Sequence, residues 1–332
     1  MLEARPRSWR PWLGRVVLAI AAAMALYLSL AIWSGLDRLS GALQGFPPAD
    51  LGVAVGLVVT GWLLRALRWH YYIRHVGWRI PWLPSTLAFL ASFAFTASPG
   101  KAGEVVKAGL LRERFGVTLT DTAGILLAER LGDFLAVLLL AAGGLTILAD
   151  ARIYYGACLL IVASVTFLVG NQRVHGTVLS WAGGSGKLKP LVETIGNLLR
   201  ITRQLLRPSI FGLALILAMA AWACEALAFH LILRGFGLSF PLLTAFSVYG
   251  VSTVVGALSM LPGGIGGTEA GMVLLLKALG VSAAEAVGPV VLTRFSTLWL
   301  ISAFGFVFLG VWWRTQGRGK TEEVAKGTPS GV

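Results

Sequence analysis

The chain has 332 residues, of which 56% are hydrophobic and only 13% are charged. A soluble globular protein carries about 25% charged residues, so this composition excludes an ordinary soluble fold and predicts a chain solvated largely by lipid. The formal net charge of +13 raises the alternative of nucleic-acid binding. We expect no nucleic-acid partner, because the basic residues are spread over the flanks of apolar segments. The predicted fold class is an all-α integral membrane protein, a polytopic helical bundle.

The first apolar run, from Val16 to Trp33, follows an arginine-rich N-terminus. It is long enough to cross a bilayer, which takes about 20 residues, and it lacks a convincing cleavage site. We interpret residues 1–49 as a retained transmembrane helix and its loop. Further crossing helices are predicted from long apolar stretches at 50–67, 119–149, 154–170, 209–233 and 284–313. The polar residues 315–332 are predicted to form a disordered tail.

Two shorter apolar stretches, 84–98 and 240–261, run into breaks rich in proline and glycine. The breaks contain Pro99, Gly100 and Gly103 in the first case, and Pro262, Gly263, Gly264, Gly266 and Gly267 in the second. Irregular backbone at membrane depth is tolerated only where it faces protein or water. Each stretch therefore predicts a Pro/Gly-broken re-entrant hairpin.

The two hairpins belong to an internal repeat. One set of matches keeps an offset of 160 residues and pairs His70, Arg74, Gly77 and Pro81 with His230, Arg234, Gly237 and Pro241. A second set keeps an offset of 164 and pairs Gly116 and Arg130 with Gly280 and Arg294. Such an ordered series predicts two copies of one unit, at 50–170 and 209–314. Residues 171–208 between them are predicted to be a cytoplasmic linker with an amphipathic helix from Pro190 to Leu206.

The orientation follows from the basic segments, which lie at the N-terminus, at Arg65–Arg79, at Lys187–Arg207 and in the tail. Roughly six full crossings and two hairpins place all of them on one side, so both termini are expected in the cytoplasm, with the chain in the cell membrane. The first hairpin then enters from the cytoplasm and the second from outside. The two repeats are therefore predicted to be inverted, as in many secondary transporters, although one miscounted crossing would make them parallel.

Ionisable side chains inside membrane segments are costly, and they are functional candidates by default. The candidate substrate-binding residues are Lys101, Glu104, Glu129, Arg130, Asp133, Glu269 and Arg294, and Lys107 and Glu225 are further charges in apolar segments. Glu104 and Glu269 follow the two breaks, where a carboxylate caps a helix N-terminus. Arg130 and Arg294 are expected to pair with these two acids, to bind an anionic phosphate head group, or both. Glu129 and Asp133 flank Arg130 and predict an internal charge network.

Three motifs resemble one family. They are the Pro-Gly-x-x-Gly-Glu turn at 99–104, the Glu-Arg-x-x-Asp at 129–133, and the Pro-Gly-Gly-Ile-Gly-x-x-Glu at 262–269 followed by Arg294. They are similar to the lysylphosphatidylglycerol synthase transmembrane region family of flippase-like membrane proteins. In the bifunctional members of that family, this membrane region flips aminoacylated phospholipid made by a fused cytosolic synthase. We expect no such synthase domain in this chain, because it ends soon after its last apolar segment. Other stand-alone members are associated with glycolipid, polyprenyl-lipid or hopanoid pathways.

These observations predict a flippase or transporter that moves a polar, anionic, aminoacylated or glycosylated lipid head group across the cytoplasmic membrane. The expected partners are a phospholipid or lipid-linked substrate and, as a further possibility, a lipid-modifying enzyme. We expect no cofactor and no metal, because the cysteines and histidines are scattered and no nucleotide-binding glycine loop is present. The alternatives are an intramembrane lipid-modifying enzyme that uses Glu104 or Glu269, and a non-catalytic membrane partner of a lipid synthase or glycosyltransferase.

Overall fold

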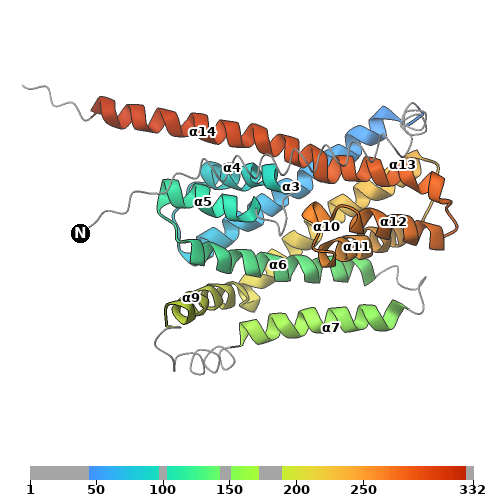
Figure 1. Cartoon of the computed structure of the whole chain (residues 1–332), viewed down its shortest axis with the longest axis horizontal. Helices are drawn as coiled ribbons and strands as arrows, with labels where there is room; N and C mark the ends of the chain where they lie inside the picture. Colours follow the sequence, from blue (N-terminus) through green and yellow to red (C-terminus); the bar gives the residue numbers. More distant parts are fainter. Residues whose placement is uncertain (1–44, 97–102, 143–150, 172–188, 327–332) are drawn as a thin grey trace, which may run out of the picture.

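The computed structural model describes residues 45–96, 103–142, 151–171 and 189–326. Every regular element in these ranges is helical, and the helices run roughly along the long axis of one elongated bundle (Figure 1). This confirms the all-α prediction. The helix predicted over Val16–Trp33 lies outside the described residues.

The same order of elements occurs twice. Each half has a long helix, a short apolar helix, a break, a second short helix and a long helix. The first half comprises α3 (Pro48–Val76), α4 (Trp82–Ser92) with η1 (Phe93–Phe95), α5 (Gly103–Phe115) and α6 (Leu119–Ala141). The second comprises α10 (Pro208–Gly235), α11 (Leu242–Leu258), η4 (Pro262–Gly264), α12 (Gly267–Ala278), α13 (Ala283–Arg294), the π-helical η5 (Phe295–Trp299) and α14 (Leu300–Lys326). Between them lie α7 (Ala151–Gly170) and α9 (Lys189–Leu205).

The repeat is also visible in the way the helices end and begin. Gly77 after α3 and Gly237 after α10 have φ angles of 98° and 77°, a region that glycine enters without steric cost. At the starts of α6 and α13, the hydroxyls of Thr118 and Ser282 each accept a hydrogen bond from the backbone N–H three residues later. The matched positions in the sequence therefore build matched helix ends.

The counterpart helices α3 and α10 form the most extensive helix pair among the described elements. They pack antiparallel, because the Phe46 ring just before α3 lies 5.3 Å from the Phe236 ring just after α10, while Gly61 faces Ala221 halfway along (Figure 1). Antiparallel packing of counterpart helices is what an inverted repeat requires. This packing supports the predicted inverted repeat. The orientation of the two halves across a membrane stays a prediction.

The two hairpins start and finish at opposite ends of the bundle. At the end where α9 lies, called the α9 end, the Trp82 ring at the start of α4 packs 4.9 Å from His70, and Arg114 near the end of α5 lies 5.5 Å from the Trp312 ring. The pair α11 and α12 begins after α10 and finishes before α13, at the other end, called the α13 end (Figure 1). Re-entrance of the hairpins into a bilayer remains a prediction.

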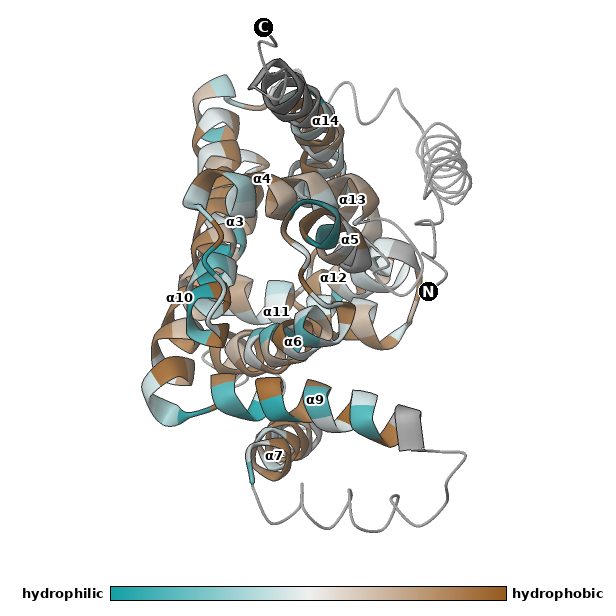
Figure 2. Cartoon of the chain, turned by 90° about the vertical axis from the view of Figure 1, so that its left-hand side faces the viewer, coloured by the Kyte–Doolittle hydropathy of each residue, from teal (hydrophilic) through white to brown (hydrophobic). Residues whose placement is uncertain are grey.

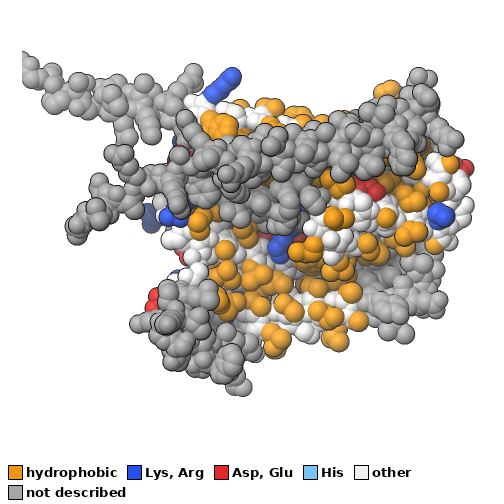
Figure 3. All heavy atoms as spheres, viewed as in Figure 1, with side chains coloured by type: hydrophobic (Ala, Val, Ile, Leu, Met, Phe, Trp, Pro, Cys, Tyr) orange, Lys and Arg blue, Asp and Glu red, His pale blue; other side chains and the backbone are white. Residues whose placement is uncertain are grey.

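The outside of the bundle is suited to lipid. Three helical segments, Pro48–Val76, Pro208–Gly235 and Ala283–Thr315, are long and apolar enough to cross a membrane. Large apolar side chains such as Leu160, Phe167 and Ile216 are exposed, and Figure 3 shows many apolar and few charged side chains on the described part of the face in view. An exposed apolar surface of this extent is costly in water and favourable in lipid.

The helix α9 lies where the sequence predicts an amphipathic linker helix, and its cytoplasmic location stays a prediction. Its residues Ile201 and Leu205 are buried, and Thr202 donates a 3.1 Å hydrogen bond to the carbonyl of Gly124 on α6. Figure 2 shows α9 lying across α6, with hydrophilic and hydrophobic residues mixed along its length.

Two predictions of chain organisation need correction. Arg65 and Arg68 do not lie in a basic connecting segment, because α3 continues through both of them to Val76. Acidic partners inside the bundle compensate the two charges, so the helix does not need to end before them. At the other end of the chain, α14 continues to Lys326, into the segment predicted to be disordered. No proline interrupts the sequence there before Pro329.

Candidate functional site: a charged cavity between the hairpins

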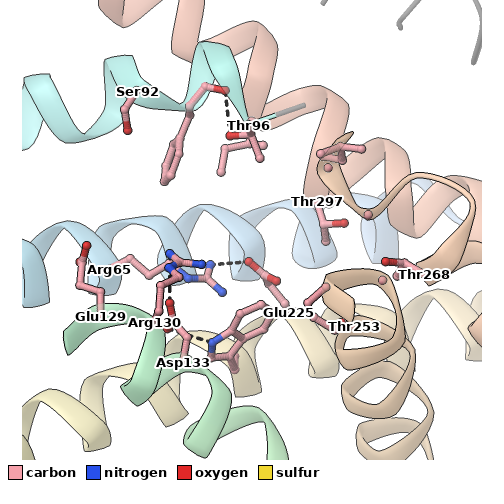
Figure 4. A pocket seen from close by; sticks show the side chains of 18 of the residues that line it. Arg65, Ser92, Thr96, Glu129, Arg130, Asp133, Glu225, Thr253, Thr268 and Thr297 are labelled. Carbon is pink, nitrogen blue, oxygen red and sulfur yellow. Dashed lines mark hydrogen bonds and ion pairs between the residues drawn. The ribbon is translucent and has the colours of Figure 1, made fainter. Parts of the chain in front are cut away.

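A cavity of about 360 Å³ lies inside the bundle, between η1 of the first hairpin and η4 of the second. Helices of both halves line it: α3, α5 and α6 from the first, and α10, α11, α12 and α13 from the second. Figure 4 shows charged side chains gathered on the α3, α6 and α10 side of this space and threonines on the side of the second hairpin. Most of the intramembrane charges singled out in the sequence meet here.

The most deeply buried part of the site is a chain of alternating charges. Arg68 Nη1 lies 2.7 Å from Asp133 Oδ1, and Arg68 Nη2 lies 3.9 Å from Glu129 Oε1. Lys107 Nζ lies 2.6 Å from Glu129 Oε2 and stacks 4.1 Å above the Trp69 ring. The side chains of Arg68 and Lys107 are only 2% exposed. Charges this buried are tolerated only when paired, so this chain of charges confirms the network predicted around Glu129 and Asp133.

A second group links α3 to α10 and α11. Arg65 forms an ion pair with Glu225, and the Tyr249 hydroxyl donates a 2.6 Å hydrogen bond to the other carboxylate oxygen of Glu225. The Arg65 guanidinium lies 4.5 Å from the centre of the Trp222 ring. The Trp222 indole N–H in turn donates to Asp133 Oδ1 at 3.1 Å. Arg65 and Asp133 thus connect the two halves of the chain through Trp222 and Glu225.

Arg130 is the most exposed of the described cations that line the cavity. Its Nη2 lies 3.3 Å from Asp133 Oδ2, and its side chain is 31% exposed (Figure 4). Asp133 is shared, because its Oδ1 also accepts from Arg68 and Trp222. The partner expected for Arg130, Glu104, belongs to α5, but its side chain is outside the described part of the structure. The Arg130–Glu104 pair therefore stays a prediction.

The second break is held by Glu269 and Arg294, as predicted. Glu269 Oε2 accepts a 2.7 Å hydrogen bond from the N–H of Gly266, and Oε1 accepts one of 2.8 Å from Arg294 Nε. Arg294 Nη2 donates to the carbonyl of Gly263 at 2.7 Å. The φ angles of Gly263, Gly264 and Gly266 are 61°, 66° and 85°, which explains the glycines of this turn. Both the helix cap and the ion pair are confirmed, and together they fix the turn.

The two halves contribute unequally to the cavity. The first-half charges Arg68, Lys107, Glu129 and Asp133 have as repeat counterparts Ala228, Gly271, Thr293 and Thr297. Most of the described charges therefore gather on one side, while the opposite side offers hydroxyls, backbone and Arg294. A ligand with an ionised part and a neutral polar part fits such a site in one orientation.

The predicted site residues divide into three groups. Lining the cavity are Glu129, Arg130, Asp133, Arg294, Gly263 and Gly264. In the turn and at the start of α12 are Pro262, Gly266, Gly267 and Glu269, and at the start of α5 are Gly103 and Glu104. Outside the described residues are Pro99, Gly100 and Lys101. Among the residues that are described, no group of three or more His, Cys, Asp or Glu is placed to hold a metal ion.

The sequence interpretation missed four residues of the site: Arg65, Arg68, Trp222 and Tyr249. A signal was present for Arg65, because the offset of 160 that relates His70 to His230 also relates Arg65 to Glu225. No comparable signal marks Trp222 or Tyr249, which look like ordinary apolar membrane residues.

Comparisons with known proteins find similar membrane proteins. The family model described as "Lysylphosphatidylglycerol synthase TM region" matches residues 15–305. Two relatives from Methanothermobacter thermautotrophicus, each named "UPF0104 membrane protein", are 26% and 24% identical to this chain. Each alignment covers 87% of this chain, and 91% and 92% of the respective relative.

Proposed function

This chain is a membrane protein of the lysylphosphatidylglycerol synthase transmembrane region family, and we propose that it translocates the polar head group of a membrane lipid across the bilayer. The observation that carries the proposal is the charged cavity enclosed by both halves of an otherwise apolar bundle. Charged groups inside a membrane are expensive, and they are characteristic of substrate and ion pathways.

The cavity also reaches the outer surface of the bundle. Met260 and Leu261, between α11 and η4, line the cavity, and yet the Met260 side chain is 75% exposed and Leu261 is exposed as well. We call these two residues the apolar rim. In the proposed function, the head group enters the cavity past this rim while the acyl chains stay outside in lipid. Met260 has a φ of 56°, a strained conformation for a residue other than glycine, and such strain often marks functional sites.

The arrangement of the hairpins supplies a route from one side to the other. One hairpin comes from the α9 end and the other from the α13 end, and the cavity lies between them. In transporters with inverted repeats, the two halves exchange conformations around a central site. We propose that small movements of the hairpins open the cavity to one end and then to the other.

The basic α9 end is placed on the cytoplasmic side in this proposal. Among the described residues it carries Arg74, Arg79, Arg112, Arg114, Arg200, Arg203 and Arg207, whereas the α13 end carries Arg234 and Lys277. An excess of Lys and Arg marks the cytoplasmic side of membrane proteins. The end of α14 then lies on the cytoplasmic side (Figure 1), as the sequence predicts, and the cytoplasmic N-terminus stays a prediction.

Acid–base chemistry at Glu269 has less support than translocation. Each of its carboxylate oxygens already accepts a short hydrogen bond, one from Gly266 and one from Arg294. A carboxylate held in this way stabilises a turn and is poorly placed to exchange protons with a substrate. An intramembrane enzyme would have to use other groups.

The proposal is tested by reconstitution into liposomes that contain a trace of phosphatidylglycerol carrying a dithionite-sensitive fluorophore on one acyl chain. Protein-containing vesicles should lose the pool of label that is protected in the inner leaflet of empty vesicles. Lipid extracted after the assay and analysed by mass spectrometry should be chemically unchanged. An unchanged protected pool for anionic, aminoacylated and glycosylated lipids alike would contradict translocation, and a modified lipid would indicate an enzyme.

A further inference from the structure

We propose that Glu129 is a proton-binding site, and that a proton bound there loosens the first hairpin and allows the cavity to open. What the opening moves across the membrane rests on the proposed function. The position of the proton and its effect on the hairpin rest on the surroundings of Glu129 alone.

Glu129 differs from the other described carboxylates of the site in how its two oxygens are used. Asp133, Glu225 and Glu269 each have a hydrogen-bond donor or a cation at both oxygens. Glu129 Oε1 receives no hydrogen bond from the described residues, and Arg68 approaches it only to 3.9 Å. The Glu129 side chain is 1% exposed, and a buried oxygen without a donor is unusual in a folded protein.

A proton completes this carboxyl group without displacing any contact. It adds to Oε1 and forms an O–H bond there, while Oε2 continues to accept the 2.6 Å hydrogen bond from Lys107 Nζ. The group becomes neutral, which removes the cost of keeping a carboxylate out of water. Glu129 lines the cavity, and Figure 4 shows it on the α6 side of that space, so the proton has a route from the cavity. Acids inside membrane proteins often serve as proton carriers.

The charged and titratable groups around Glu129 come from three helices. They are Lys107 on α5, Arg68 and Tyr72 on α3, and Arg130 and Asp133 on α6 itself. Glu104 is also on α5, but its side chain is outside the described part of the structure. Proton binding depends on this whole cluster, and Glu129 is the described acid that offers an oxygen without a donor.

The Lys107–Glu129 pair holds the first hairpin against the long helix α6. Lys107 belongs to α5, the second short helix of that hairpin. A proton on Glu129 turns the ion pair into a weaker hydrogen bond between a cation and a neutral acid. Lys107 stays supported, because its ammonium also lies 4.1 Å from the Trp69 ring and 4.9 Å from the Phe89 ring. The proton thus loosens the contact between α5 and α6 without abandoning the buried lysine.

Among the described residues, the second hairpin has no counterpart of this contact. At an offset of 164, Lys107 and Glu129 correspond to Gly271 and Thr293, and the Thr293 hydroxyl donates to the Pro289 carbonyl of its own helix at 2.7 Å. A proton at Glu129 therefore acts on one hairpin only, the one that comes from the α9 end. Acid should bias the protein toward opening of the cavity at that end.

Proton binding is tested by infrared difference spectroscopy of the purified full-length protein between alkaline and acidic buffer. The C=O band of a protonated acid in a buried site is separated from the bands of acids exposed to water. The wild type should gain such a band on acidification, and Glu129→Gln should lack it. The controls Glu193→Gln and Arg200→Gln, both on the exposed face of α9, should keep the wild-type band.

The effect on the hairpin is tested by hydrogen exchange and by lipid movement. In alkaline buffer, α5 should exchange faster in Glu129→Gln than in the wild type, because glutamine resembles the protonated acid. In proteoliposomes, a short-chain fluorescent phosphatidylglycerol that albumin can extract reports lipid movement. The wild type should move this lipid several-fold faster in acidic than in alkaline buffer, whereas Glu129→Gln should be equally fast in both. The double variant Lys107→Met/Glu129→Gln leaves neither buried charge, so it keeps the test valid if Glu129→Gln alone does not fold, and it should show the same pH independence.

Three results would overturn the inference: a band of a buried acid that is absent from the wild type or unchanged in Glu129→Gln, equal exchange of α5 in Glu129→Gln and the wild type, or a wild-type pH dependence of lipid movement in both variants. Failure of the proposed function gives a different pattern. A band that depends on Glu129, together with no lipid movement in the wild type, contradicts translocation alone. Lipid movement without the band contradicts proton binding alone.

Discussion

Arg65 and Glu225 are counterparts in the two repeats, 160 residues apart, and they form an ion pair with each other. Gly61 and Ala221, which have the same offset, also face each other across α3 and α10. Counterpart positions on two antiparallel helices can meet at only one level, where a two-fold axis passes between the helices. The centre of the repeat relationship therefore lies close to these two pairs, beside the cavity.

Exchanging the charges of this pair should separate its electrostatic role from its shape. Arg65→Glu or Glu225→Arg alone places two like charges together in a buried position, and breaking a buried pair costs about 3–5 kcal/mol. Each single variant should have a clearly lower thermal midpoint in detergent. The double variant Arg65→Glu/Glu225→Arg should recover part of the loss, although Tyr249 and Trp222 are matched to the native order. A double variant as unstable as the sum of the two singles would show that the pair does not act as a unit.

Asp133 should be the most sensitive acid of the site. It accepts from Arg68 and Trp222 and contacts Arg130, so Asp133→Asn removes a negative charge and leaves Glu129, at 3.9 Å, as the one described carboxylate paired with the buried Arg68. The expected loss of stability is again about 3–5 kcal/mol. The double variant Arg68→Met/Asp133→Asn should recover part of the lost stability, because the buried Arg68 charge is then no longer present without its partner.

The control for this comparison is Glu193→Gln on the exposed surface of α9, which should leave the thermal midpoint unchanged. If Asp133→Asn were as stable as this control, the buried charge chain would carry little of the stability of the fold.

The Glu269–Arg294 pair should behave as a brace of the second hairpin. Arg294→Ala removes both the ion pair and the hydrogen bond to Gly263, so the turn loses its external support. We expect lower thermal stability and slower lipid movement together, with Arg294→Lys intermediate in both. Loss of lipid movement at full stability would instead assign Arg294 to the substrate.

Close packing beside the cavity should make Gly256 intolerant of a side chain. An added Cβ would collide with the Thr268 hydroxyl, whereas the same change at Gly212 on α10 meets nothing within 4 Å. Gly256→Ala should cost about 1–3 kcal/mol, as overpacking does. Gly212→Ala should be neutral or stabilise by up to about 1 kcal/mol through helix propensity. Equal effects of the two changes in thermal unfolding would contradict the tight α11–α12 contact.

Local chemistry explains which parts of this fold and site were predictable. Short-range sequence signals predicted three features. A carboxylate just after a break indicated the capping Glu269 and its pairing with Arg294, the run of glycines indicated the turn, and the helical periodicity of apolar residues indicated α9. Arg65 and Arg68 were misassigned to a connecting segment because a charge normally ends an apolar run. Their partners Asp133, Glu129 and Glu225 are 61 to 160 residues away. Long-range neutralisation of this kind has no local pattern, so only the folded arrangement shows it.

The central claim is tested most directly by the initial rate at which labelled phosphatidylglycerol becomes accessible to dithionite in proteoliposomes, at equal protein content for wild type, Arg130→Gln and Arg200→Gln. The account predicts rapid loss of the protected pool for the wild type and for Arg200→Gln, and a rate at least about tenfold lower for Arg130→Gln. Wild-type vesicles that are indistinguishable from empty ones would contradict it.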